Sequence, residues 1–264
     1  MLKRILTSAV GLVIFFAVLA SSSTVFAAAI LLVTACMLYE LYKAMDAHPA
    51  LFVLGFLSCA LYTYGIFSTK FLPAAVTAMV LYLIATVALF HKVHFRDIYA
   101  SAFITLFISA FMIMISMIRI QFGAEFVLLV FICAWMTDSG AYFAGRFFGR
   151  HKLAPNLSPK KTIEGSIGGS MICVVSCVVY LLILHQFMGY QVQVNSYLQI
   201  ALVGLLASVF GQLGDLIASA IKRDCGVKDF GSILPGHGGV LDRFDSVVFI
   251  APFIYYILFR MNIL

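Results

Sequence analysis

Long apolar runs, each close to the length of a transmembrane helix, follow one another along most of this chain. A helix needs about 20 apolar residues to cross the hydrocarbon core of a bilayer. The chain is 63% hydrophobic and 11% charged, whereas soluble proteins carry roughly 25% charged residues. Because lipid leaves backbone hydrogen bonds no partner outside the chain, we expect an all-α, polytopic membrane protein.

The apolar runs predict about nine transmembrane helices. A run from residue 5 to residue 39 is long enough for two spans with a turn near residues 21–24. Its basic start and the small residues around 25–28 also resemble a secretory signal, but we favour an uncleaved first helix. Further runs cover residues 50–69, 71–90, 98–118, 126–137, 166–184, 197–214 and 246–259. We expect residues 1–264 to form a single integral membrane domain, with N-terminal spans in 1–120 and site-bearing spans and loops in 121–264.

The positive charges predict the orientation of these spans. If the N-terminus is cytoplasmic and the spans alternate, only Lys70, Arg119 and Arg260 of the 17 Lys and Arg residues fall outside. This bias agrees with the positive-inside rule. The net charge of +6 is therefore interpreted through topology, and no nucleic-acid partner is expected. Both long charged loops would face the cytoplasm, where nucleotides occur.

A first polar cluster lies in residues 135–169. Asp138 falls in an apolar span, where a carboxylate costs roughly 2.5 to 3.5 kcal/mol, so we expect a cation or a basic side chain beside it. The following loop supplies Arg146, Arg150, Lys152, Lys160 and Lys161, with Ser158, Thr162 and Glu164 around the lysine pair. The next helix would offer its N-terminal amides to an anion. A basic surface for anionic lipid headgroups is the alternative; we favour an anion site.

A second polar cluster begins in the predicted eighth span. Ala207, Gly211, Asp215, Ser219 and Arg223 recur every four residues, so they share one face of a helix, and this face resembles a binding wall. Lys222 lies beside it. The glycines of residues 226–239 suit an irregular backbone able to approach a ligand.

Two carboxylates follow this glycine-rich segment. Asp242 and Asp245 lie three residues apart at the expected start of the ninth span. Carboxylates are the natural ligands of Mg²⁺, which usually shares its shell with water and substrate phosphates. A structural salt-bridge network is the alternative for these aspartates. Five of the six cysteines lie in apolar runs and are expected to be small buried hydrophobes, whereas Cys225 lies among charges.

Residues 219–245 carry a dense set of polar, glycine and proline positions. The set comprises Ser219, Lys222, Arg223, Lys228, Asp229, Gly231, Leu234, Pro235, His237, Gly238, Gly239, Asp242, Arg243 and Asp245. Residue by residue and spacing by spacing, it resembles the signature of the phosphatidate cytidylyltransferases, also called CDP-diacylglycerol synthases. The segment 138–169 is similar to the second polar block of that family, and the multi-span layout extends the similarity over most of the chain.

The resemblance implies transfer of CMP from CTP to phosphatidic acid, which yields CDP-diacylglycerol for phospholipid biosynthesis and releases pyrophosphate. It implies Mg²⁺ with a second, monovalent cation such as K⁺, at a paired-metal centre whose two aspartates correspond to Asp215 and Asp242. Similar proteins are dimeric, so a homodimer is expected. The expected partners are CTP, phosphatidic acid and membrane lipids, and the expected location is a bacterial cell (inner) membrane with the site facing the cytoplasm.

The predicted roles follow from this chemistry, in which an anionic phosphate needs cations more than a strong base. The predicted catalytic residues are Asp215, Lys222, Arg223, Asp242 and Arg243, and the metal ligands are Asp215 and Asp242, with Asp138 as a further candidate. The predicted substrate-binding residues are Ser158, Lys160, Lys161, Thr162, Glu164, Ser219, Lys228, Asp229, His237, Gly238, Gly239 and Asp245. His237 would either donate to a phosphate or brace the glycine-rich turn.

Two other functions share some of these features. An ion-coupled secondary transporter also uses intramembrane carboxylates and broken helices, but here the charges gather towards one face and no internal repeat is visible. A CTP-dependent lipid kinase would share the nucleotide and the lipid phase. Analysis of the products formed from labelled CTP separates all three functions.

Overall fold

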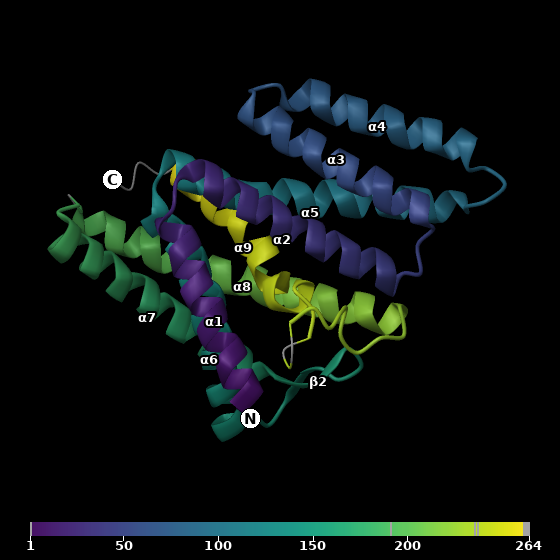
Figure 1. Ribbon diagram of the computed structural model, residues 1–264. Helices are drawn as coiled ribbons and strands as arrows, with labels where there is room; N and C mark the ends of the chain where they lie inside the picture. The colour runs from purple at the N-terminus through teal and green to yellow at the C-terminus, as the bar shows by residue number, and fades with distance from the viewer. Residues whose placement is uncertain (1, 191, 235, 237, 261–264) are drawn as a thin grey trace. The chain divides into compact units, whose positions relative to one another are not determined.

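The computed structural model describes residues 2–190, 192–234, 236 and 238–260, and these residues form a helical protein with one small sheet (Figure 1). The helices are α1 (Leu2–Ala20), α2 (Ser23–Ala44), α3 (Pro49–Phe67), α4 (Phe71–Ala88), α5 (Phe95–Gln121), α6 (Ala124–Phe148), α7 (Ile163–Met188), α8 (Val194–Asp224) and α9 (Leu241–Arg260). Each predicted span coincides with one of these helices. The all-α class is therefore confirmed.

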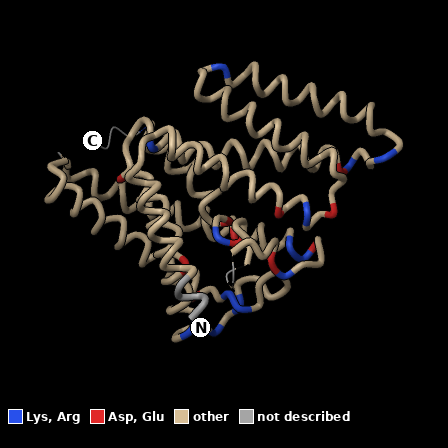
Figure 2. Tube along the Cα trace, viewed as in Figure 1, with Lys and Arg blue, Asp and Glu red and all other residues tan. Residues whose placement is uncertain are grey.

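Seven of the described helices, α2 to α8, are long and apolar enough to cross a membrane. The apolar part of α1, Thr7–Ala20, is shorter, and α9 carries charged residues in its first turn and Pro252 in its interior. Lys, Arg, Asp and Glu gather near helix ends and in loops, and the middles of the helices are almost free of them (Figure 2). The chain is a multi-pass membrane protein.

The chain divides into two compact units. The first consists of Met1–Ser116 and Cys225–Arg243, and the second of Met117–Asp224 and Phe244–Leu264. The first unit therefore holds α1 to α4, most of α5, the glycine-rich segment and the first residues of α9. The second holds α6, α7, α8, the small sheet and the remainder of α9. That residues 1–264 act as one membrane domain stays a prediction.

Helices α6 and α7 of the second unit approach closely because glycines face each other. A Cβ atom at Gly165 would lie 2.8 Å from the carbonyl oxygen of Ala141, and one at Gly169 would lie 2.6 Å from that of Thr137. Small residues at such positions let two helix backbones pack together in a membrane.

Gly169→Ala should destabilise the second unit, because the new methyl group has no room against the backbone of α6. Overpacking of this kind costs about 1–3 kcal/mol, which thermal unfolding in detergent would detect. Gly11→Ala is the matched control, since a Cβ there meets nothing within 4 Å. Equal melting temperatures for the two variants would contradict the packing role of Gly169.

A short hairpin, which the sequence did not predict, joins α6 to α7. Strand β1 (Lys152–Ala154) pairs antiparallel with β2 (Ser158–Thr162), with Lys152 opposite Thr162 and Ala154 opposite Ser158. Thr162 then caps α7, since its hydroxyl accepts a hydrogen bond of 3.1 Å from the backbone N–H of Gly165. The extended backbone of β2 leaves Lys160 exposed and turns Lys161 to the half-buried side.

Candidate active site

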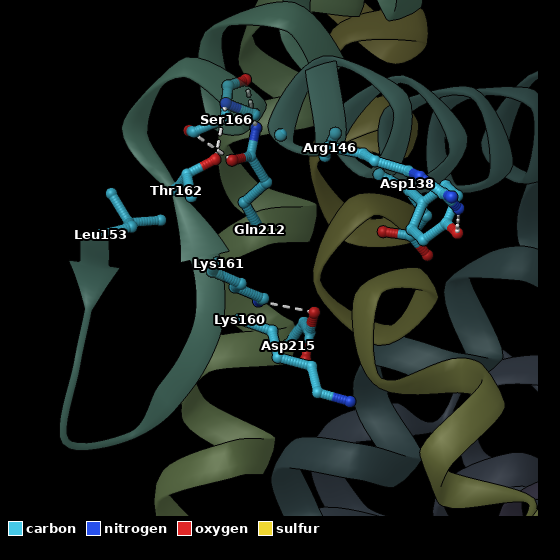
Figure 3. Close-up of a pocket in the computed structure, with 13 residues that line it drawn as sticks. Asp138, Arg146, Leu153, Lys160, Lys161, Thr162, Ser166, Gln212 and Asp215 are labelled. Carbon is cyan, nitrogen blue, oxygen red and sulfur yellow. Dashed lines mark hydrogen bonds and ion pairs between the residues drawn. The ribbon is translucent and has the colours of Figure 1, made fainter. Parts of the chain in front are cut away.

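The second unit contains a cavity of about 400 Å³ between α6, the hairpin, the start of α7 and α8. Its wall includes Asp138 and Arg146 of α6, Lys160 and Lys161 of β2, and Asp215 of α8 (Figure 3). The structure thus brings together, in one cavity, basic and acidic residues that the sequence assigned to two separate clusters.

The central contact of the cavity is an ion pair between the hairpin and α8. Lys161 Nζ lies 2.5 Å from Asp215 Oδ2, and both side chains are half-buried (Figure 3). An ammonium and a carboxylate attract each other more strongly where water is partly excluded. This pair fixes strand β2 against α8.

Acidic groups accumulate around this pair. Asp245 of α9 interacts electrostatically with Asp215, Asp138 and Lys222. Helix α9 comes this close because α8 has a glycine at the contact: a Cβ at Gly214 would lie 2.7 Å from the carbonyl oxygen of Asp245. Carboxylates that share a half-buried site repel one another, so the arrangement favours a bound cation or a basic group.

A hydrogen-bond network lies on α8 one turn before Asp215. Gln212 Nε2 donates to Ser170 Oγ and Ser208 Oγ, both at 3.1 Å, and Ser166 Oγ donates to Gln212 Oε1. Gln212 and Ser166 also line the cavity. Neither residue was predicted as part of the site, although a glutamine three residues before Asp215 on an apolar helix is a visible signal. The network holds α7 and α8 in register beside the ion pair.

Glu164 lies at the start of α7 but outside the wall of this cavity. Its carboxylate accepts hydrogen bonds from the backbone N–H groups of Arg150, at 3.0 Å, and His151, at 3.2 Å. It also lies 2.6 Å from His151 Nδ1. Glu164 therefore holds the turn that enters the hairpin, and its predicted contact with substrate stays a prediction.

Comparison with known proteins gives the family. A family model described as "Cytidylyltransferase family" matches residues 2–261. The chain belongs to the cytidylyltransferase family. Phosphatidate cytidylyltransferase of Bacillus subtilis (strain 168) is 47% identical over 138 residues, which are 52% of this chain and 49% of the relative.

Two staphylococcal relatives are similar to the chain to the same degree. Phosphatidate cytidylyltransferase of Staphylococcus haemolyticus (strain JCSC1435) is 48% identical over 139 residues, 53% of this chain and 51% of the relative. That of Staphylococcus aureus (strain COL) is 49% identical over 139 residues, 52% of this chain and 50% of the relative. The chain thus spans about half the length of these curated relatives.

The remaining predicted site residues lie at the start of β2, at the end of α8 and in the first unit. Ser219 is buried in α8, Lys222 is half-buried, and Arg223 is exposed with its Nε 3.5 Å from the carbonyl oxygen of Leu157. Ser158 begins β2. In the first unit, Lys228, Asp229 and Arg243 are exposed. His237 lies outside the described residues.

The carboxylate of Asp242, in the first unit, is held by two backbone N–H groups. Its Oδ2 accepts hydrogen bonds from the backbone N–H groups of Phe230, at 2.9 Å, and Gly239, at 3.1 Å. Between these two residues the chain turns back on itself, with Gly238 at φ +85° and the N–H of Leu234 donating to its carbonyl oxygen at 3.1 Å. Asp242 belongs to the first unit and Asp215 to the second, so their joint role as metal ligands stays a prediction.

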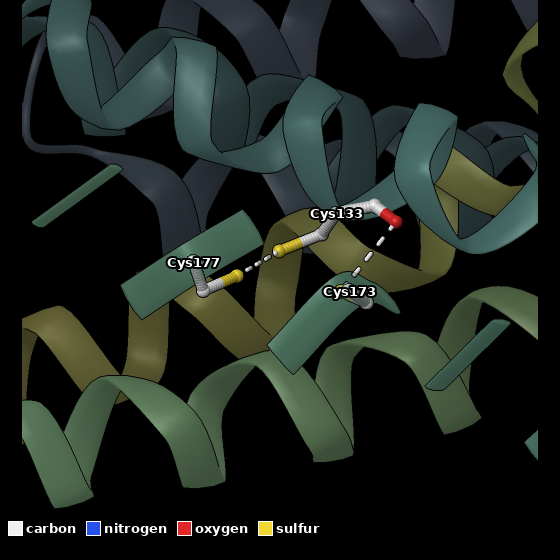
Figure 4. A group of neighbouring side chains, drawn as sticks. All are labelled: Cys133, Cys173 and Cys177. Atoms are coloured by element: carbon white, nitrogen blue, oxygen red, sulfur yellow. Dashed lines mark hydrogen bonds between the residues drawn. The ribbon is translucent and has the colours of Figure 1, made fainter. Parts of the chain in front are cut away.

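Three buried cysteines meet between α6 and α7 (Figure 4). The sulfur atoms of Cys133 and Cys177 lie 3.5 Å apart, and that of Cys173 lies 3.3 Å from the carbonyl oxygen of Gly204. None of the six cysteines forms a disulfide in the described structure. These three are small buried side chains at a helix contact, as the sequence predicted.

Proposed function

We propose that the protein transfers CMP from CTP to phosphatidic acid, forming CDP-diacylglycerol and pyrophosphate. The observation that carries the proposal is the cavity in which Lys161 pairs with Asp215 beside Asp138, Arg146 and Lys160. Such a cavity in a multi-pass membrane protein suits a lipid phosphate and a nucleoside triphosphate. The family and the printed names of the relatives support the same reaction.

The reaction is an attack of one phosphate on another. A phosphate oxygen of phosphatidic acid forms a bond to the α-phosphorus of CTP, the bond from that phosphorus to the β-phosphate oxygen breaks, and its electron pair leaves with pyrophosphate. The attacking oxygen is already anionic near neutral pH, so no strong base is required. The main barrier is repulsion between anions, which positive side chains reduce.

The basic residues of the two clusters supply that positive charge. Lys160 and Lys161 would neutralise CTP or the leaving pyrophosphate, with Ser158 and Thr162 on the same strand. Lys222, Arg223 and Arg243 would neutralise phosphate oxygens. Ser219, Lys228, Asp229, Gly238, Gly239 and Asp245 complete the proposed substrate site. Glu164 would contact the substrate from the turn that enters the hairpin.

The donor atoms fit Mg²⁺, which prefers hard oxygen ligands and often takes only one or two carboxylates. Asp215 and Asp242 would hold it, with Asp138 as a further ligand and a monovalent cation such as K⁺ beside it. The bound metal would neutralise phosphate charge and polarise the α-phosphate. Among the described residues, the group of three ligand atoms within 4.8 Å of one another belongs to cysteines. Water and substrate phosphates, which usually share the shell of Mg²⁺, would therefore supply most of its ligands.

The positive-inside bias supports a cytoplasmic active site, and the bacterial relatives support the cell (inner) membrane. We expect a homodimer.

One assay tests the reaction: purified protein with labelled CTP, phosphatidic acid and Mg²⁺ should form labelled CDP-lipid. Phosphorylated lipid with CDP would instead indicate a lipid kinase, and solute flux in liposomes without any reaction would indicate a transporter.

Lys161→Ala should lower turnover by about 10²-fold, the order expected when one positioned donor to a phosphate is lost. Lys160→Ala should mainly raise the KM for CTP, because that side chain is exposed and makes no ion pair among the described contacts. Steady-state kinetics with CTP as the varied substrate measures both effects. Lys152→Ala on the neighbouring strand is the control, since Lys152 is exposed and outside the cavity wall. Equal kinetics for all three variants would indicate that the hairpin binds anionic lipid headgroups and not CTP.

A further inference from the structure

Glu40 is a buried carboxylate in the last turns of α2, a helix otherwise rich in apolar residues. Its side chain is only 1% exposed. A carboxylate inside a membrane domain is costly and marks a functional position by default. Glu40 stands alone in its apolar run, far along the chain from both polar clusters, so its sequence position does not connect it to them.

The carboxylate of Glu40 meets the start of α9 within the first unit. Its Oε2 accepts a hydrogen bond of 2.9 Å from the backbone N–H of Leu241, the first residue of that helix. The N-terminal N–H groups of a helix carry partial positive charge and stabilise an anion placed there. Glu40 therefore fixes the point at which α9 begins, one residue before Asp242.

The glycine-rich segment is shaped around the same carboxylate. A Cβ atom at Gly239 would lie 2.5 Å from Glu40 Oε2, and one at Gly231 would overlap Glu40 Oε1. Neither position has a left-handed backbone, so conformational freedom is not what requires glycine. The contact with Glu40 explains both glycines without a ligand.

Glu40 and Asp242 hold this segment together. Asp242 Oδ2 accepts the N–H of Gly239 and that of Phe230, the neighbour of Gly231. Glu40 contacts Gly231 and Gly239. It also accepts a hydrogen bond from the backbone N–H of Leu241, two residues after Gly239. Two carboxylates thus bind the two ends of one loop.

We propose that Glu40 is a positioning residue for Asp242: it sets the start of α9 and the backbone of residues 230–231 and 239–241, so that the Asp242 carboxylate is held ready for its ligand. The inference rests on the proposed function in that Asp242 is assigned to the metal there. Simple packing does not account for a charge at this position. Glu40 Oε1 has no hydrogen-bond partner among the described residues, and an apolar side chain would fill the space without that penalty.

The first test measures metal binding without turnover, by electron paramagnetic resonance titration of the purified protein with Mn²⁺ alone. Glu40→Ala should weaken Mn²⁺ binding by about 10- to 100-fold, the range seen when a residue supporting a metal ligand is removed. Glu40→Gln keeps an acceptor for Leu241 and should lose less. Turnover should fall in the same order, through kcat more than through the KM for CTP.

Leu51→Ala is the control for lost stability. Leu51 is fully buried in the first unit, in a separate cluster with Tyr82, Val93 and Ile98. Its truncation should lower the melting temperature without changing Mn²⁺ affinity. If Leu51→Ala weakens Mn²⁺ binding as much as Glu40→Ala does, or if Glu40→Ala binds Mn²⁺ normally, the positioning role is overturned.

A double-mutant cycle tests the contact itself. Gly239→Ala alone should weaken Mn²⁺ binding because its methyl group displaces Glu40. Added to Glu40→Ala, the same change should cost little more, since the obstructing carboxylate is gone. Losses that multiply would show that Gly239 serves something other than Glu40 and would overturn the proposal. A protein that makes no CDP-lipid would refute the proposed reaction, yet the Mn²⁺ titrations would still decide the role of Glu40.

Discussion

Asp215→Asn should abolish formation of CDP-diacylglycerol, with a loss of at least about 10³-fold, while the protein stays folded in detergent. The amide has the size of the carboxylate but cannot balance Lys161 Nζ, 2.5 Å away, and is a poor ligand for Mg²⁺. The measurement is turnover of labelled CTP, with the melting temperature followed in parallel. Near-normal turnover would remove Asp215 from the metal site.

Two further variants separate the charge of Asp215 from its ion pair. Asp97→Asn changes an exposed carboxylate in the first turn of α5 and should leave turnover unchanged. Lys161→Met combined with Asp215→Asn removes both partners, so it should recover the stability lost by stranding the ammonium. It should not recover turnover. Recovery of turnover would mean that the loss in Asp215→Asn comes from the unpaired charge of Lys161 and not from a missing metal ligand.

The membrane helices could be predicted from the sequence because their signal is local. An apolar run must be long enough to cross the bilayer, and each predicted run coincides with a described helix. The ends were less accurate where polar residues continue a helix. The sixth span was predicted to end at residue 137, yet α6 continues to Phe148, since the polar face of its last turns lines a cavity rather than lipid.

The contacts of the candidate site depend on tertiary structure and could be predicted only in part. The sequence indicated that Asp138 needs a cationic neighbour and that Lys161 and Asp215 serve one site, but not that these two form an ion pair. The hairpin escaped because strands of three and five residues leave almost no periodicity. Glu40 was missed although a single acid in an apolar run is itself a signal; its partners lie some 200 residues away along the chain.

Asp242→Asn and Asp242→Ala should both lose turnover, but for different reasons. The asparagine keeps an oxygen that can accept the N–H groups of Phe230 and Gly239, which Asp242 binds at 2.9 and 3.1 Å. It loses the negative charge that a metal ion requires. The alanine also leaves those N–H groups without an acceptor, which costs about 1–3 kcal/mol for each such group that is buried.

The pair of variants therefore distinguishes metal binding from support of the loop. Asp242→Asn should fall in turnover by about 10³-fold with little change in melting temperature, whereas Asp242→Ala should also unfold at lower temperature. Turnover near normal in Asp242→Asn, together with loss in Asp242→Ala, would assign Asp242 to the loop alone. In that case Glu40 and Asp242 would be two supports of one backbone segment, and the metal would have to depend on the carboxylates of the second unit, Asp138, Asp215 and Asp245.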